Sequence, residues 1–349
     1  MERYIGMDVH AASCTLAVIS EKGRKLKDFP VETNGQALVE AVRMIPGHKH
    51  LVFEEGIQSA WLYETLSPHV DEVVVAGITQ SRGPKSDKRD AYGLAEKLRV
   101  GNLDKHVFKA PRQFTQLREL SRAHMTLVGD VVRTQARIKS VYRSRGVLVA
   151  GVDVYSPRRR DSWIEQLPSS TRTRATRLYD HLDFLMEQKK QAEADLLREG
   201  KKHRIVKILE TAPGFGPIRA ARLVPIVITP HRFRTSRQFW SYCGLGIVMR
   251  SSSDWVRVDG RWIRGDVAKT RGLNRNHNRT LKWIFKGAAT TVLTHGLPLK
   301  DHYDRMCEAG TKPNLAKVTL ARKIAAITLA MWKNEEVYDP RRHRDQVEQ

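Results

Sequence analysis

The chain has 349 residues, enough for two or three domains with buried cores, and its 61 lysines and arginines outnumber its 38 acidic residues, so the net charge is +23. Such an excess indicates a polyanionic partner. Because there is no apolar run of about 18 residues and no N-terminal signal peptide, nucleic acid is a better candidate than a membrane. The three scattered cysteines form no CxxC motif, which argues against a zinc site or a disulfide framework and favours a reduced, cytoplasmic protein.

The N-terminal part alternates between β-rich and helical segments. Short β-rich runs predict strands over residues 3–9, 15–20, 24–29, 50–54 and 72–76. Apolar residues at helical spacing predict helices over residues 34–45, 61–66 and 92–100. Three strands followed by alternating helices and strands are typical of an α/β layer with a mixed sheet.

Two acidic residues stand at the ends of predicted strands. Asp8 closes the first strand, and Glu54 closes the strand that begins near residue 50. Glu55 is the rival of Glu54, since alternation along a strand sends neighbouring side chains to opposite faces. We favour Glu54 because the apolar run Leu51-Val52-Phe53 leads directly into it. The structural alternative for Asp8 is a strand-end acid that caps a turn.

Two further acids lie in the stretch Lys85-Ser86-Asp87-Lys88-Arg89-Asp90-Ala91. Ser86 is a good N-cap, so Asp87 opens a helix and Asp90 follows one turn later on the same face. Such acids can also serve only as partners of the helix dipole. If all four acids converge, their repulsion implies bound cations, and Mg²⁺ suits an all-oxygen site. Two such ions can activate one oxygen and stabilise the leaving one in phosphodiester chemistry.

Two long helical stretches follow, over about residues 113–145 and 170–197, with the loop-like break Ser156-Pro157-Arg158-Arg159-Arg160 between them. Leucines and a methionine form one stripe on the second stretch. This pattern predicts a helical hairpin or a coiled-coil arm. The stripe would pack within the chain or against a partner subunit, and we favour dimerisation.

The C-terminal part contains a glycine-rich turn and a basic segment. The turn Gly214-Phe215-Gly216 precedes a predicted helix over residues 218–224, and its free backbone N–H groups could hold a DNA phosphate as helix-hairpin-helix elements do. Many helix connections carry glycines, so this motif is weak by itself. Residues 255–264 alternate like a hairpin around Asp259-Gly260. A later segment is denser in cations than a solvated helix needs and predicts a phosphate-binding surface. Its cations are Lys269, Arg271, Arg275, Arg279, Lys282 and Lys286.

Together these motifs resemble a known family. Tyr4–Asp8, Phe53-Glu54 and the stretch 85–91 are similar to the DEDD transposase domain of the IS110 insertion-sequence family. The second domain of that family is similar to the C-terminal half, and the similarity covers roughly residues 3–330 in family order. The matching segments there are Ala212–Gly216, Tyr242–Leu245, Ser251–Ser253 and Asp266–Lys282.

The resemblance implies an RNase-H-like (RuvC-like) α/β domain over residues 1–108, a coiled-coil arm over 109–200, a mainly helical transposase domain over 201–335 and a polar tail over 336–349. It also implies recombination of donor and target double-stranded DNA, guided by a structured bridge RNA. By the same resemblance Asp8, Glu54, Asp87 and Asp90 bind Mg²⁺, for which Mn²⁺ could substitute in vitro. Dimers pairing into a tetramer, in a bacterial or archaeal cytoplasm, are expected.

A serine of the second domain is the implied nucleophile. Counting on from Gly244-Leu245, Ser252 falls on the family serine, with Ser251 and Ser253 as rivals. The family shows serine followed by glycine, whereas Asp254 follows here. A serine hydroxyl needs activation. No histidine stands where it would mark a base, and His10 is interpreted as a surface or turn residue. We therefore expect metal held by the first domain to activate a serine of the second.

Three other function classes are weighed. A metal-dependent nuclease or junction resolvase would use the four acids without a covalent serine step. A basic nucleic-acid-binding scaffold would keep the acids for structure only. The RNase-H-like fold also hosts sugar kinases and ATPases, but residues 1–100 have no recognisable phosphate-cradling glycine loop, which weakly disfavours that branch.

Overall fold

The structure, a computed structural model, describes residues 1–78, 86–103, 106–110, 113–250, 255–264 and 269–343. Contacts divide the chain into two units, Met1–Gln113 and Phe114–Gln349. Each unit has its own buried apolar core.

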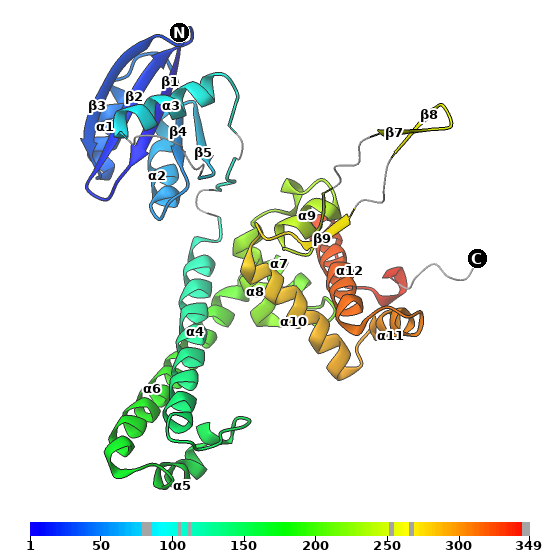
Figure 1. The fold of residues 1–349 in the computed structure, drawn as a ribbon. Helices are drawn as coiled ribbons and strands as arrows, with labels where there is room; N and C mark the ends of the chain where they lie inside the picture. Colours follow the sequence, from blue (N-terminus) through cyan, green and yellow to red (C-terminus); the bar gives the residue numbers. More distant parts are fainter. Residues whose placement is uncertain (79–85, 104–105, 111–112, 251–254, 265–268, 344–349) are drawn as a thin grey trace. The chain divides into compact units, whose positions relative to one another are not determined.

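The first unit is built on one mixed five-stranded sheet of order β3-β2-β1-β4-β5 (Figure 1). β1 pairs antiparallel with β2 and parallel with β4. The strands are β1 Glu2–Val9, β2 Ser13–Ser20, β3 Lys25–Glu32, β4 His48–Glu54 and β5 Glu72–Ala76. The helices are α1 Gly35–Arg43, α2 Ser59–Leu66 and α3 Asp87–Arg99, with the 3₁₀ turn η1 Ser67–His69. The predicted order of strands and helices is confirmed, and this arrangement is compatible with an RNase-H-like domain.

The two faces of this sheet are covered differently. On one face, Ile5, Met7 and Phe53 are fully buried in a core that also includes residues of α1 and α2. On the other face, α3 packs against β1, and the contact is close because residue 6 is a glycine. Since side chains alternate along a strand, Asp8 extends from the face that carries Gly6 and α3.

The second unit begins with two long antiparallel helices, α4 Thr115–Arg143 and α6 Ser169–Gly200, which lie side by side (Figure 1). Their pairing is marked near the connection by the Tyr142 and Tyr179 hydroxyls, 2.9 Å apart, and near the opposite end by buried Leu117 and Leu196 in one cluster. The short elements η2 Asp153–Tyr155, η3 Pro157–Arg159 and α5 Arg160–Glu165 connect them. The predicted helical hairpin is present; a coiled coil stays a prediction.

The rest of the second unit is mainly helical. α8, α10 and α12 share a core with α7 and α9, and that core includes fully buried Phe285 and Leu320. The helices are α7 Arg204–Leu209, α8 Pro217–Val227, α9 Ser236–Tyr242, α10 Arg279–His295, α11 Lys300–Glu308 and α12 Pro313–Asn334, with 3₁₀ turns η4 Pro230–Arg232 and η5 Pro340–His343. Among the described residues, no helix combines the length and the apolar character needed to cross a membrane.

Short strands interrupt these helices. β6 Ile247–Arg250 pairs with β9 Lys269–Leu273, and β7 Trp255–Val258 pairs with β8 Arg261–Arg264. The predicted hairpin around Asp259-Gly260 is therefore confirmed. The basic segment is not one helix: its first residues form β9, a loop follows, and α10 begins at Arg279. The physical reason is that β9 finds a strand partner in β6.

Candidate metal centre and nucleic-acid surface

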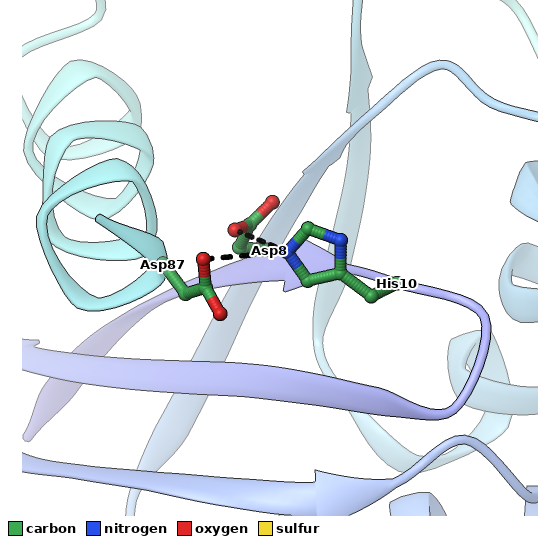
Figure 2. Close-up of side chains that lie close together, drawn as sticks. All are labelled: Asp8, His10 and Asp87. Carbon is green, nitrogen blue, oxygen red and sulfur yellow. Dashed lines mark ion pairs between the residues drawn. The ribbon is translucent and has the colours of Figure 1, made fainter. Parts of the chain in front are cut away.

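Asp8, His10 and Asp87 meet at one end of the sheet (Figure 2). The His10 Nε2 atom lies 3.2 Å from Asp8 Oδ2 and 3.4 Å from Asp87 Oδ1. One ligand atom from each of the three side chains lies within 4.8 Å of the other two. Asp8 comes from β1 and Asp87 from the first turn of α3, so two acids far apart in sequence become neighbours.

Local structure explains the position of Asp87. Ser86 occupies the N-cap position in an extended conformation, as predicted, but its side chain makes no capping hydrogen bond. Asp90 N–H donates to Ser86 O at 2.8 Å, so Asp90 follows Asp87 by one helical turn. The first turn of α3 is also tied to β3, because Lys88 Nζ lies 2.7 Å from Asp28 Oδ1 and the Tyr92 hydroxyl donates to Asp28 Oδ2 at 3.1 Å. The bond from Lys88 is the main cause that lowers the pKa of Asp28.

Glu54 and Glu55 have different surroundings. Met7 pairs with Phe53 across the parallel strands β1 and β4, so Asp8 and Glu54 follow at the next position on the same face. Glu55 accepts a hydrogen bond from the Ser59 hydroxyl of α2 at 3.1 Å and forms an ion pair of 2.7 Å with Lys109 Nζ. Glu55 therefore has a structural role on the side of α2.

His10 is an unexpected member of this site. The residue lies in the β1–β2 turn, where its N–H donates to Ser13 O at 3.1 Å, and its side chain is 54% exposed. The interpretation as a turn residue is confirmed for the backbone, yet the imidazole contacts both acids. The Asp8-Val9-His10 spacing at the end of β1 could have indicated this contact. His10 is the first residue after the strand, and its imidazole turns back toward Asp8.

The donor set fits a hard divalent cation. Asp8 and Asp87 offer carboxylate oxygens within reach of one ion. The Asp87 side chain is 60% exposed, so water molecules have access to the remaining coordination positions of such an ion. The other two predicted ligands are not part of this cluster: Glu54 ends β4, and Asp90 follows Asp87 by three residues on α3.

The predicted nucleophile segment and part of the basic segment are not described in the structure. Ser251, Ser252 and Ser253 lie outside the described residues, as do the side chains of Lys269 and Arg271 on β9. Of the other predicted phosphate-binding residues, Arg275 and Arg279 are exposed and Lys282 is partly exposed. Arg279 and Lys282 lie on α10, one helical turn apart.

The glycine-rich turn has two distinct halves. Gly214 has a positive φ of 69°, and a β-carbon there would lie 2.2 Å from Ala288 O of α10. Only glycine therefore allows the turn to approach α10 this closely. Gly216 has no described atom within 4 Å of a β-carbon position, and Pro217, without an N–H, opens α8. Gly214 has a packing role, whereas the surroundings of Gly216 stay open.

Comparison with known proteins agrees with this architecture. Residues 5–144 match the family model for the IS110-type DEDD transposase domain, described as "Transposase", and residues 206–273 match the model described as "Transposase IS116/IS110/IS902 family". The chain is 22% identical, over 97% of its own length and 96% of the relative's, to the insertion element IS116 uncharacterized 44.8 kDa protein of Streptomyces clavuligerus. It is 27% identical, over 47% of its length and 38% of the relative's, to the insertion element IS110 uncharacterized 43.6 kDa protein of Streptomyces coelicolor. The chain belongs to the IS116/IS110/IS902 family of insertion-element transposases.

Proposed function

We propose that this transposase recombines DNA by a covalent serine step that depends on a divalent metal, with a structured guide RNA choosing the DNA sites. The observation that carries the metal part is the meeting of Asp8 and Asp87 at His10. The RNA and the serine are implied by the family resemblance of the motifs. The net charge of +23 supports binding of a polyanion.

Asp8, Glu54, Asp87 and Asp90 would hold Mg²⁺, or Mn²⁺ in its place. When bound, the cation supplies positive charge next to the phosphate oxygens. The chain's own residues have the other tasks: the acids would hold the ion at the edge of the sheet, and His10, whose Nε2 lies 3.2 Å from Asp8 and 3.4 Å from Asp87, would offer a nitrogen ligand beside their carboxylates. The cations of α10 would bind the DNA or RNA backbone without reading its sequence.

In the covalent step, Ser252 Oγ attacks a DNA phosphorus. A new ester bond to the serine forms as the bond to one DNA oxygen breaks, and the proton lost by the hydroxyl ends on the departing oxygen. The hydroxyl of another DNA end then attacks the phosphorus of the serine ester, which releases the serine and rejoins the strands. The ester bond to the serine therefore conserves the energy of the broken phosphodiester bond. The acids come from the first unit and the serine from the second, so both units are needed for the reaction.

A denaturing assay tests this proposal. Full-length protein with its co-purifying RNA is mixed with labelled DNA that carries the element ends and with Mg²⁺, and label bound to protein is measured after quenching. We expect an adduct in the wild type that is lost in Ser252→Ala and Asp87→Asn but kept in Ser251→Ala, Ser253→Ala and the matched control Glu55→Gln.

Each other result would assign a different nucleophile or a different function to this protein. Loss of the adduct only in Ser251→Ala or Ser253→Ala moves the nucleophile to that serine. DNA cleavage without an adduct favours a plain metal-dependent nuclease, since hydrolysis by water leaves none. If treatment of the protein with RNase leaves its activity unchanged, the proposed role of a guide RNA is contradicted. Absence of both RNA and cleavage leaves a basic binding protein.

A further inference from the structure

One face of α10 combines cations with an exposed indole. Arg279, Lys282, Trp283 and Lys286 are spaced three and four residues apart, so they lie on one side of the helix. Trp283 is 57% exposed. The opposite side of α10 is fully buried in the core, through Leu281, Ile284, Phe285, Ala288 and Val292. The core contacts of α10 are thus complete without Trp283, and its exposure has no packing reason.

In the part of the chain that the structure describes, the cations on this face have no acidic partner. α10 itself contains no Asp or Glu. Within the described part of the chain, no ion pair is recorded for Arg279, Lys282 or Lys286. A cluster of unpaired cations around an apolar ring disfavours an apolar protein partner, because its charges would lose water without compensation. The same cluster suits a polyanion.

The indole is held in place from the neighbouring helix. The guanidinium carbon of Arg222, on α8, lies 5.5 Å from the centre of the Trp283 ring. Arg222 is itself buried, with an exposed fraction of 3%, and its Nη2 lies 3.2 Å from Nδ1 of buried His124 on α4. Burial and the charge of Arg222 lower the pKa of His124 to about 4, so the imidazole is neutral at pH 7 and accepts this hydrogen bond. The ring therefore rests on a fixed cation rather than on a mobile surface.

A second arginine of α8, Arg219, approaches α10 at Gly287, one helical turn after Trp283. Arg219 Nη2 is 3.3 Å from the place where a β-carbon on Gly287 would stand, so the glycine lets the guanidinium approach the helix. Arg219 Nη1 donates to Gly214 O at 2.6 Å, and burial lowers the pKa of Arg219. No carboxylate partner of Arg219 is recorded among the described residues. Cations thus flank Trp283 on two sides, from α10 and from α8.

We propose that Trp283 is a stacking platform for an unpaired nucleotide, with the cations of α10 and Arg219 of α8 binding the phosphates next to it, while buried Arg222 supports the ring from below. An indole has the largest π-face among side chains, and a base stacks on it whatever its sequence. A base inside a duplex is already stacked on its neighbours and cannot use the platform, so the site selects single strands or looped-out bases. The inference rests on the nucleic-acid binding of the proposed function, but on neither the serine nor the metal.

The test measures affinities of the full-length protein in EDTA, so that no chemistry takes place. The probes are deoxyuridine and uridine homopolymers of about 16 nucleotides, which differ in the 2′-hydroxyl, and a blunt duplex of the same length. We expect Trp283→Ala to weaken binding of the single strands roughly 5- to 100-fold, as loss of one stacked base does, with little effect on the duplex. Trp283→Phe should retain most of the affinity. The two single strands show whether DNA or RNA is the better occupant.

Matched variants separate stacking from charge and from folding. Phe184→Ala removes another exposed aromatic ring, 61% exposed on α6, and should leave single-strand binding unchanged. Lys286→Ala should lower the salt dependence of binding by about 0.7 in the log–log slope, whereas Trp283→Ala should not change that slope. Equal losses in Trp283→Ala and Trp283→Phe, an equal loss on the duplex, or no loss would overturn the proposal. Failure of the covalent assay would leave these affinities untouched.

Discussion

Gly6 and Ala91 define how closely helix α3 approaches strand β1: a β-carbon on Gly6 would lie 1.9 Å from the carbonyl oxygen of Ala91. This distance is far below any contact that real β-carbons make, so the two elements pack at this spacing only because residue 6 has no side chain. Asp8 stands two residues after Gly6, and Asp87 stands one turn before Ala91. The meeting of the two acids depends on this close approach.

We expect Gly6→Ala to push α3 away from the sheet and to separate Asp87 from Asp8. The added methyl group would meet backbone atoms, which cannot rotate aside, so the first unit should lose about 1–3 kcal/mol of stability. A shift of the acids by about 1 Å should lower strand-transfer activity about 100-fold. Thermal unfolding and the DNA adduct assay measure the two effects.

Gly93→Ala is the control for this variant. Gly93 lies on the same helix, and a β-carbon there has no described atom within 4 Å. Alanine in a helix interior is more favourable than glycine, so this change should stabilise the first unit by about 0.5–1 kcal/mol and keep the activity. Equal behaviour of the two variants would contradict the close-packing argument.

Glu54→Gln and Glu55→Gln should separate activity from stability. Lys109, whose side chain is 16% exposed, would lose its ion pair in Glu55→Gln, and we expect a cost of about 1–3 kcal/mol with the activity retained. Glu54→Gln should abolish the metal-dependent reaction with a smaller effect on the melting temperature. Loss of activity only in Glu55→Gln would exchange the two roles.

His10 should affect the choice of metal. Mg²⁺ prefers oxygen ligands, whereas Mn²⁺ also accepts imidazole nitrogen, and His10 Nε2 lies beside both acids. We expect His10→Ala to weaken Mn²⁺ binding about 10-fold or more, with a smaller change for Mg²⁺, as measured by calorimetry. Asp8→Asn should weaken both ions. A His10→Ala protein that loses both ions equally would show that the imidazole only orients the acids.

The buried His124 should make the second unit sensitive to acid. Burial, Arg222 and Lys189 lower its pKa from 6.5 to about 4 and outweigh the Glu193 carboxylate, which lies 3.5 Å from His124 Nε2. Between these pH values the unfolded chain therefore binds a proton that the folded chain does not. Stability is therefore unaffected by this group above pH 6.5 and is lost as the pH falls toward 4, by up to roughly 3 kcal/mol.

Comparison with His124→Gln isolates this contribution, because glutamine does not titrate and its carbonyl oxygen can accept the hydrogen bond from Arg222. Urea unfolding of both proteins from pH 7 to pH 4 gives the difference, in which the carboxylates common to both cancel. We expect the difference to grow in favour of the variant as the pH falls. A constant difference would mean that His124 is protonated in the folded state.

Much of the fold could be predicted from periodicity. The strands and helices of the first unit and the two long helices of the second follow the predicted order, since alternation and helical spacing are local properties that burial then reinforces. The boundary of the basic segment could not be predicted. Its residues 269–273 pair with residues of β6 that lie 19 to 26 positions earlier in the chain, and local spacing does not reveal such a partner.

The sequence by itself determined the charge, the order of elements and the identity of the four acids as candidates, because charge is additive and each acid follows a recognisable strand or cap. Only the tertiary structure decided that the absence of a side chain at Gly6 brings Asp87 close to Asp8. It also decided that the His10 imidazole contacts both acids and that Glu55 forms an ion pair with Lys109. It also brought His124, Arg222 and Trp283 together from α4, α8 and α10. These relationships join residues far apart in the chain, and their distances depend on packing rather than on spacing.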